Sequence, residues 1–234
     1  MKANLAVIVT NYNKKPQEIE ECFQSIKDQT VQPEEVIFVD DHSESIHMPR
    51  EVMTIALPKN MGVSAARDVG VRMSRSKLLL FVDADDKLGP DFIQRCGEKI
   101  RAVGKDGADI VYSDFVTFGD VERNALHKNP DRVTPEYLMG RSMTILVTSM
   151  MYRSMYDDLG GFHEVPVFED WDFWLRAMAK GYTFAKANTL FWYRQNKSSR
   201  GNKPLSFRED VHKQITARFR VQEGKLVWVQ NAQK

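Results

Sequence analysis

Short apolar runs alternate with amphipathic stretches along the first 115 residues. The runs LAVIVT at 5–10, VIFV at 36–39 and LLLFV at 78–82 contain no turn signals and predict buried strands. Between the first two runs, apolar residues recur at helical spacing over 19–26. This alternation predicts an α/β fold with a mostly parallel central sheet flanked by helices.

The same criteria place shorter elements in the rest of the chain. Strands are predicted at 52–57, 109–112, 143–152 and 183–193, and helices at 62–73, 90–103, 134–140, 169–180 and 204–222. Near residue 130 the strand–helix alternation gives way to a mixed arrangement. No long linker interrupts the pattern, so a single domain is expected.

Composition agrees with one globular domain. Of the 234 residues 42% are hydrophobic and 28% charged, with a formal net charge of +1, so overall charge indicates no polyanionic partner. Two cysteines, Cys22 and Cys96, are too few for a disulfide framework and favour a cytoplasmic location. No apolar run reaches transmembrane length, so membrane contact is expected to be peripheral.

Positive charge is concentrated at the end of the chain. Residues 194–234 contain ten Lys/Arg against three Asp/Glu, a balance of +7 that leaves −6 for residues 1–193. Phe207, Phe219 and Trp228 are interleaved with these cations. Such a segment can serve a phosphate-rich ligand, an anionic membrane or nucleic acid; the alternative is a solvated surface helix.

A carboxylate cluster, Asp83-Ala84-Asp85-Asp86, follows the apolar run at 78–82. Alternate residues of an extended chain share a face, so Asp83 and Asp85 can converge on a hard cation such as Mn²⁺ or Mg²⁺. Alternatively, the cluster is a polar turn in which Asp86 caps the next helix. Taken alone, these residues leave both interpretations open.

Three more polar clusters follow predicted strands, at 10–13, 40–43 and 113–114. Parallel strands bring such ends to one edge of the sheet, where open α/β sheets bind ligands. The helix that begins near Gly62 could direct backbone N–H groups and Arg67 towards a phosphate; the alternative is a surface arginine on an ordinary helix.

Glu169 and Asp170 begin a predicted helix in apolar surroundings that include Phe168 and Trp171. The helix dipole alone would explain acidic residues there. An apolar setting would instead raise a carboxyl pKa towards that of a useful base. The local pattern is compatible with either role.

Seven motifs, taken in order, resemble those of the family 2 glycosyltransferases, inverting enzymes with the GT-A fold. They are VIVTNYN at 7–13, VIFVDDHS at 36–43, NMGVSAARDVG at 60–70, LLLFVDADD at 78–86, GGFHE at 160–164, EDWDFWLR at 169–176 and WYRQNKSS at 192–199. Each is weak alone, but together they cover most of residues 5–200 in family order. The resemblance implies a GT-A fold with one Rossmann-like sheet and a small mixed acceptor-side region.

The resemblance also divides the single domain. Residues 1–115 would form a nucleotide-binding half, 116–203 an acceptor and catalytic half, and 204–234 a basic C-terminal helix and tail. The nucleotide-sugar side would comprise Thr10, Tyr12, Asp41, Asn60, Arg67, Asp83, Ala84 and Arg194, and the acceptor side Gly161, Glu169 and Trp171. Asp85, with Asp83, would bind a divalent ion, and Asp170 would be the catalytic base.

Two positions depart from the family pattern. Many relatives carry His shortly after the Tyr-Arg pair, where this chain has Gln195 and Asn196. Water would then replace a third side-chain metal ligand. His42 stands where glycine is usual, so that turn is expected to differ slightly.

The implied reaction moves a sugar from a nucleotide-diphosphate sugar, usually a UDP-sugar, to an acceptor hydroxyl with Mn²⁺ or Mg²⁺. Family habit and the basic tail suggest a cell-envelope glycan or lipid-linked saccharide at the inner face of the membrane, or else hydroxymethylated DNA bases. A non-catalytic nucleotide-sugar-binding module is the alternative from another class. A nucleotidyltransferase is a weaker candidate, because no glycine-rich phosphate loop follows the first strand.

Overall fold

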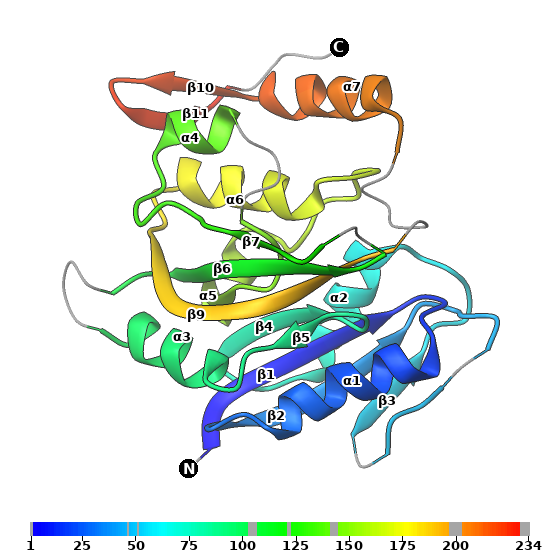
Figure 1. Cartoon of the computed structure of the whole chain (residues 1–234). Helices are drawn as coiled ribbons and strands as arrows, with labels where there is room; N and C mark the ends of the chain where they lie inside the picture. The colour runs from blue at the N-terminus through cyan, green and yellow to red at the C-terminus, as the bar shows by residue number, and fades with distance from the viewer. Residues whose placement is uncertain are drawn as a thin grey trace.

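Among the described residues, nine strands form one curved sheet in the order β3–β2–β1–β4–β8–β6–β9–β5, with β7 paired to β6 (Figure 1). The structure, a computed structural model, describes residues 2–45, 47–50, 52–102, 107–120, 123–140, 145–196 and 203–229. The strands are β1 (Lys2–Asn11), β2 (Gln32–Asp40), β3 (Met53–Ala56), β4 (Leu78–Asp83), β5 (Lys87–Leu88), β6 (Ile110–Gly119), β7 (Ala125–His127), β8 (Met150–Tyr152) and β9 (Phe184–Gln195). The helices are α1 (Pro16–Lys27), α2 (Val63–Met73), α3 (Phe92–Ile100), α4 (Pro135–Gly140), α5 (Arg153–Asp158), α6 (Glu169–Ala179) and α7 (Leu205–Thr216).

Parallel pairing dominates this sheet, as predicted. β1 pairs in parallel with both β2 and β4, and β6 pairs in parallel with β9. The antiparallel pairings of β4–β8, β6–β8, β5–β9 and β6–β7 extend over only two or three residue pairs each. Because helices cover both faces, the central strand β4 is apolar along its length rather than alternating.

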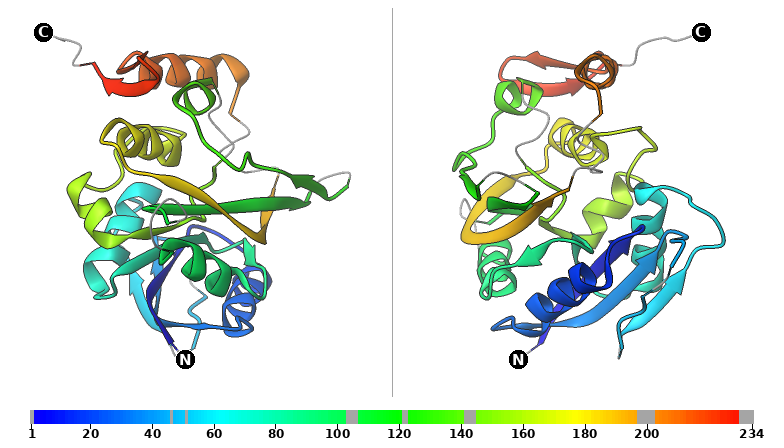
Figure 2. Two further views of the ribbon diagram at one scale, coloured as in Figure 1. Left: turned by 90° about the vertical axis from the view of Figure 1, so that its left-hand side faces the viewer. Right: turned by 45° about the vertical axis from the view of Figure 1, so that its right-hand side comes forward.

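Alternate residues of β1 belong to two different cores. Leu5 and Val7 pack with residues of α1 and α3, whereas Ala6 and Ile8 pack with residues of α5 and α6. The two-residue period of a strand produces this division. Figures 1 and 2 show α1 and α3 on one side of the sheet and α6 on the other.

A further layer, made of α7 and a small hairpin, covers α6 on the side away from the sheet (Figures 1 and 2). The hairpin consists of β10 (Phe219–Gln222) and β11 (Lys225–Trp228). Val211 and Ile215 of α7 and Phe219 of β10 join the core that contains Trp174. The C-terminal segment is therefore packed onto the body of the molecule.

The prediction of one helix over 204–222 is wrong in its second half. α7 ends at Thr216, and Phe219 is buried from a strand instead. Glu223 and Gly224 have φ of 50° and 71°, the positive values that a two-residue hairpin turn of type I′ requires. The Glu-Gly pair, centred between the apolar residues Val221 and Leu226, was the local signal for this turn.

The strand predicted at 109–112 also differs, because β6 continues to Gly119. Ser113 and Asp114 therefore lie inside a strand rather than at its end. The Asp114 carboxylate is 2.8 Å from the Lys186 ammonium of β9, so it forms an ion pair between two neighbouring strands of the sheet. Asp120 is the acidic residue that follows the end of β6.

The other elements differ less from their predicted boundaries. Of the strand predicted at 143–152, the described part keeps only β8, preceded by irregular chain at 145–149. Most of the polar loop predicted at 195–204 lies outside the described residues, as does the chain beyond 229. None of the helices in the described part of the chain combines the length and apolarity needed to cross a bilayer.

Candidate active site

Three parallel strands end at one edge of the sheet, as their polar termini predict. Thr10 of β1 lies in register with Asp83 of β4, and Asn11 of β1 lies in register with Asp40 of β2. This edge opens into a cavity of about 1010 Å³. Its lining includes the predicted site residues Thr10, Tyr12, Asp41, Asn60, Arg67, Asp83, Asp85, Glu169, Asp170 and Arg194.

Asp41 ties the end of β2 to the turn that opens α2. Its Oδ1 accepts the Met61 N–H at 2.7 Å and its Oδ2 accepts the Gly62 N–H at 2.9 Å. Gly62 has φ of 86°, and a Cβ there would meet nothing within 4 Å, so the glycine is needed for its backbone conformation. His42 adopts φ of 64°, so it keeps the left-handed turn that glycine would make.

Arg67 is the most deeply buried charge of the cavity wall, with 1% of its surface exposed. Its guanidinium donates to Asp83 Oδ1 at 2.9 Å and to Glu169 Oε1 at 2.8 Å. Burial acts to lower the pKa of Arg67, and the charges of Asp83 and Glu169 outweigh it, so the pKa lies above its ordinary value. Arg67 therefore joins the end of β4 to the start of α6.

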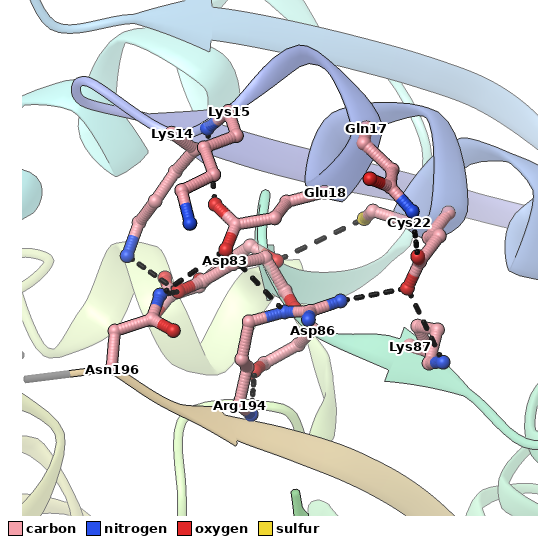
Figure 3. A network of polar contacts seen from close by, with 12 residues as sticks. Lys14, Lys15, Gln17, Glu18, Cys22, Asp83, Asp86, Lys87, Arg194 and Asn196 are labelled. Atoms are coloured by element: carbon pink, nitrogen blue, oxygen red, sulfur yellow. Dashed lines mark hydrogen bonds and ion pairs between the residues drawn. The ribbon is translucent and has the colours of Figure 1, made fainter. Parts of the chain in front are cut away.

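The carboxylates after β4 lie in a crowded acidic environment (Figure 3). Asp85 is 4% exposed, and its Oδ2 lies 2.5 Å from Lys14 Nζ. Burial raises the pKa of the Asp85 carboxyl, the Lys14 charge opposes this, and Asp83 raises the pKa further. Asp86 accepts the Arg194 N–H at 2.8 Å, and burial with the neighbouring carboxylates raises its pKa well above the usual range.

Glu169 and Asp170 are the first two residues of α6, as predicted. The preceding residue, Phe168, is left-handed, with φ of 68° and ψ of 32°. Such a conformation is costly for a bulky residue and is typically maintained by surrounding structure at functional sites. Asp170 Oδ1 accepts the Trp171 N–H at 2.8 Å, and the residue is partly exposed to the cavity.

Three predicted site residues lie outside the cavity lining. Ala84 is fully buried, and its N–H donates to the Thr10 carbonyl at 3.0 Å. Trp171 is 1% exposed and donates from Nε1 to the Leu138 carbonyl at 2.7 Å. Gly161 has φ of 75°, a conformation that favours glycine, and a Cβ there would also come within 2.8 Å of Asp68 Oδ1.

Arg194 approaches the cavity from the end of β9. Its guanidinium donates to the Asp85 carbonyl at 2.9 Å and to Glu21 Oε2 at 2.7 Å. It also lies 4.3 Å from the centroid of the Phe118 ring. These contacts hold the arginine beside the acidic cluster.

Asp83 and Asp85 supply the oxygen donors that Mn²⁺ and Mg²⁺ prefer, and both line the cavity. Among the described residues, no group of three or more His, Cys, Asp or Glu is arranged to hold a metal. Mg²⁺ is commonly bound through one or two carboxylates together with substrate phosphates and water. The two carboxylates therefore fit a divalent ion that is shared with a phosphate ligand.

Sequence reasoning missed Lys14, Glu18 and Asp120, and it noted Asn196 only as a departure from the family pattern, whereas all four line the cavity. Asn196 Nδ2 lies 3.3 Å from Asp85 Oδ2, so the amide that replaces the usual histidine contacts the proposed metal ligand. Lys14 directly follows the polar turn after β1, which was its only local signal. Its pairing with a residue 71 positions away depends on the fold.

The model of the family described as "Glycosyl transferase family 2" matches residues 6–160. The chain belongs to glycosyl transferase family 2. The matched range contains most of β1 and all of β2 and β4, and therefore Asp41, Arg67 and the carboxylates after β4. Asp170 and Arg194 lie beyond it, so their place in the site rests on the tertiary structure.

Individual relatives agree with the family. An uncharacterized glycosyltransferase of Bacillus subtilis, YwdF, is 31% identical over 191 residues, which cover 76% of this chain and 69% of the relative. The amylovoran biosynthesis glycosyltransferase AmsE of Erwinia amylovora is 23% identical over 77% of this chain and 71% of its own. Residues 1–349 of S. aureus TarS, solved with UDP-GlcNAc, share the fold with a TM-score of 0.71 at 18% identity. The match covers 92% of this chain but only 65% of the TarS fragment.

Proposed function

We propose that this chain transfers a sugar from a UDP-sugar to an acceptor hydroxyl, with inversion and with a divalent metal ion. The observation that carries the proposal is that Asp170, at the start of α6, lines the same cavity as Asp83 and Asp85, at the end of β4. The proposed base and the carboxylates proposed to bind the metal and the diphosphate therefore line the same cavity. The UDP-GlcNAc bound to TarS, which has the same fold, supports a UDP-sugar donor.

The residues divide the reaction between two sides of the cavity. Tyr12, Asp41 and Asn60 hold the nucleoside at the ends of β1 and β2. When bound, a divalent ion held by Asp83 and Asp85 would supply positive charge against the diphosphate leaving group. Arg194 adds positive charge on the same side, where negative charge develops as the sugar leaves.

Asp170 acts from the acceptor side. It takes the proton from the acceptor hydroxyl as that oxygen attacks the anomeric carbon. The bond to the diphosphate breaks on the opposite face, which gives inversion. Glu169 orients the helix start through Arg67, and Trp171 supports Phe168, whose ring centroid lies 6.1 Å from its own.

The proposed acceptor is a hydroxyl of a cell-envelope glycan or lipid-linked saccharide, presented at the inner face of the membrane. AmsE is named as an amylovoran biosynthesis glycosyltransferase, which supports a glycan acceptor. Internal contacts use part of the basic C-terminal segment, because Arg218 pairs with Asp172 and Arg208 lies 5.6 Å from the Phe168 ring centroid. Fewer cations are then left for DNA, which disfavours hydroxymethylated bases as acceptors.

The donor and the base can be tested together. Thermal unfolding is measured with UDP or UDP-GlcNAc, with Mn²⁺ or with EDTA, beside an assay of sugar transfer and donor hydrolysis. A rise in Tm that needs the metal is expected, since a ligand that binds only the folded state stabilises it. Asp170→Asn should keep this rise and lose turnover by about 10²–10⁴-fold, the usual contribution of a general base.

Full turnover by Asp170→Asn would exclude Asp170 as the base. Metal-dependent donor binding without turnover in the wild type would instead support the non-catalytic binding module. The absence of a metal-dependent Tm rise with both UDP and UDP-GlcNAc would contradict a UDP-sugar donor.

A further inference from the structure

The Lys14 ammonium stands at the carboxylate that would bind the divalent ion. Lys14 Nζ lies 2.5 Å from Asp85 Oδ2, and both side chains line the cavity. Figure 3 shows Lys14 reaching from the turn after β1 towards the acidic cluster, with Asn196 beside it. Among the described residues, Lys14 is the only Lys or Arg within ion-pair distance of the Asp85 carboxylate.

The two arginines of the cavity lining are engaged elsewhere. Arg67 pairs with Asp83 and Glu169. Arg194 directs its guanidinium to Glu21 and to the Asp85 carbonyl rather than to the Asp85 carboxylate. Lys14 therefore provides the local countercharge for a carboxylate that is almost fully buried.

Lys14 and Arg67 differ in how readily they could leave their partners. The Lys14 side chain is 27% exposed, whereas that of Arg67 is 1% exposed and bridges two elements. A lysine ammonium sits on a flexible four-carbon stem and can turn into the cavity without moving the backbone. The Lys14–Asp85 pair can therefore open while the fold stays intact.

We propose that Lys14 and the divalent ion exclude each other at Asp85, so that the ammonium occupies the place of the metal until the metal binds. This inference rests on the proposed function, because it assumes that Asp85 is a metal ligand. A cation bound to Asp85 Oδ2 would meet the ammonium at contact distance, where the two like charges repel each other strongly. Metal binding then requires the displacement of Lys14, and Lys14 sets the metal affinity.

The test measures Mn²⁺ binding by the electron paramagnetic resonance signal of the free ion, without nucleotide and with saturating UDP. Lys14→Met keeps the length of the stem and removes the charge. It should tighten Mn²⁺ binding by about tenfold, the scale of one hydrogen bond to a charged group. Lys14→Arg, which keeps the charge, should bind Mn²⁺ no more tightly than the wild type.

Lys15→Met is the matched control. Lys15 is the next residue and lines the same cavity, but its ammonium is not paired with Asp85. Lys15 is exposed to solvent, so the same loss of one positive charge should change the Mn²⁺ affinity by less than about twofold, the effect of a solvent-screened charge. A control effect equal to that of Lys14→Met would mean that only net charge matters, which contradicts displacement.

Thermal unfolding keeps the test decisive if Lys14→Met weakens the protein. Without metal this variant should be less stable than the wild type, and Mn²⁺ should raise its Tm more. Unchanged or weaker Mn²⁺ binding by a folded Lys14→Met overturns the inference. UDP binding in the same titrations separates the two proposals. If the wild type binds UDP, the donor assignment stands whatever the effect of Lys14→Met on Mn²⁺. If the wild type does not bind UDP, the proposed function itself is contradicted.

Discussion

A single buried guanidinium, that of Arg67, connects the strand end that carries Asp83 with the helix that carries Asp170. The family resemblance implied that Arg67 would help hold the nucleotide and its phosphates. In the structure, two of its nitrogens contact Asp83 and Glu169. Its contribution to the site is therefore at least partly to position two acidic residues that lie 86 positions apart in the chain.

Arg67→Met should be strongly destabilising, because it leaves the Asp83 and Glu169 carboxylates without their shared cation. Breaking a buried pair by removing one partner costs about 3–5 kcal/mol. Urea unfolding measures the loss of unfolding free energy. Arg72→Met is the control, since Arg72 is exposed on the same helix and should change stability by less than about 0.5 kcal/mol.

An Arg67 variant as stable as this control would show that the carboxylates do not depend on the guanidinium. If Arg67→Met instead approaches the stability of the wild type at low pH, where the carboxylates become protonated, the carboxylates do depend on the guanidinium. The comparison of the two variants across pH therefore tests the pairing as well as its magnitude.

At the level of elements, the C-terminal segment is bound to α6, the helix whose first two residues are Glu169 and Asp170. Asp172 of α6 is fully buried and faces His163 Nδ1 at 3.1 Å, Arg176 Nε at 3.0 Å and the guanidinium of Arg218 from the segment between α7 and β10. Burial acts to raise the pKa of Asp172, and the hydrogen bond from His163 together with the charges of Arg176 and Arg218 outweighs it and lowers the pKa. α7 also contacts the start of α6, where the His212 ring stacks on Trp171 with centroids 4.6 Å apart.

Arg218→Gln should therefore loosen the start of α6. We expect a loss of about 1–3 kcal/mol in unfolding free energy, as for a hydrogen bond to a charged group, and lower turnover with unchanged UDP affinity. Arg220→Gln is the control, because Arg220 is exposed on β10. Equal stability and turnover of the two variants would show that Asp172 needs no cation from the C-terminal segment.

At the level of the whole molecule, one glutamate ties the sheet to the connection between α2 and β4. Glu35 of β2 accepts hydrogen bonds from the Arg75 N–H at 2.9 Å, from the Ser76 N–H at 2.8 Å and from the Ser76 hydroxyl. Partial burial acts to raise the pKa of Glu35, and these donors outweigh it and lower the pKa. Ionised Glu35 therefore stabilises the folded state.

The sign of the resulting pH dependence follows from this lowered pKa. The stabilising contribution is present above the unfolded-state pKa of about 4.3 and is lost as the pH falls through the lower folded-state value. Glu35→Gln should be about 1 kcal/mol less stable than the wild type at pH 7, and the difference should disappear in acid. Unfolding curves at several pH values measure it, with the exposed neighbour variant Glu34→Gln showing no such pH-dependent difference.

Hydrophobic periodicity determined the class of fold, because strands and helices repeat every 2 and every 3.6 residues whatever surrounds them. The strands β1, β2 and β4 and the helices α1, α2 and α6 were predicted within a few residues. Polar residues after parallel strands then indicated which edge of the sheet carries the site. The hairpin after α7 was missed, since Phe219 satisfies the helical spacing and the strand packing equally well.

Which charges neutralise each other was decided only by the tertiary structure. Lys14 and Asp85 are 71 positions apart, and Arg67 and Glu169 are 102 apart, so no local pattern records either pair. Coulombic attraction depends on distance in space and on burial, both of which the packing of β1, β4 and α6 creates. The sequence by itself determined which residues could do the chemistry, and the fold decided which of them hold each other in place.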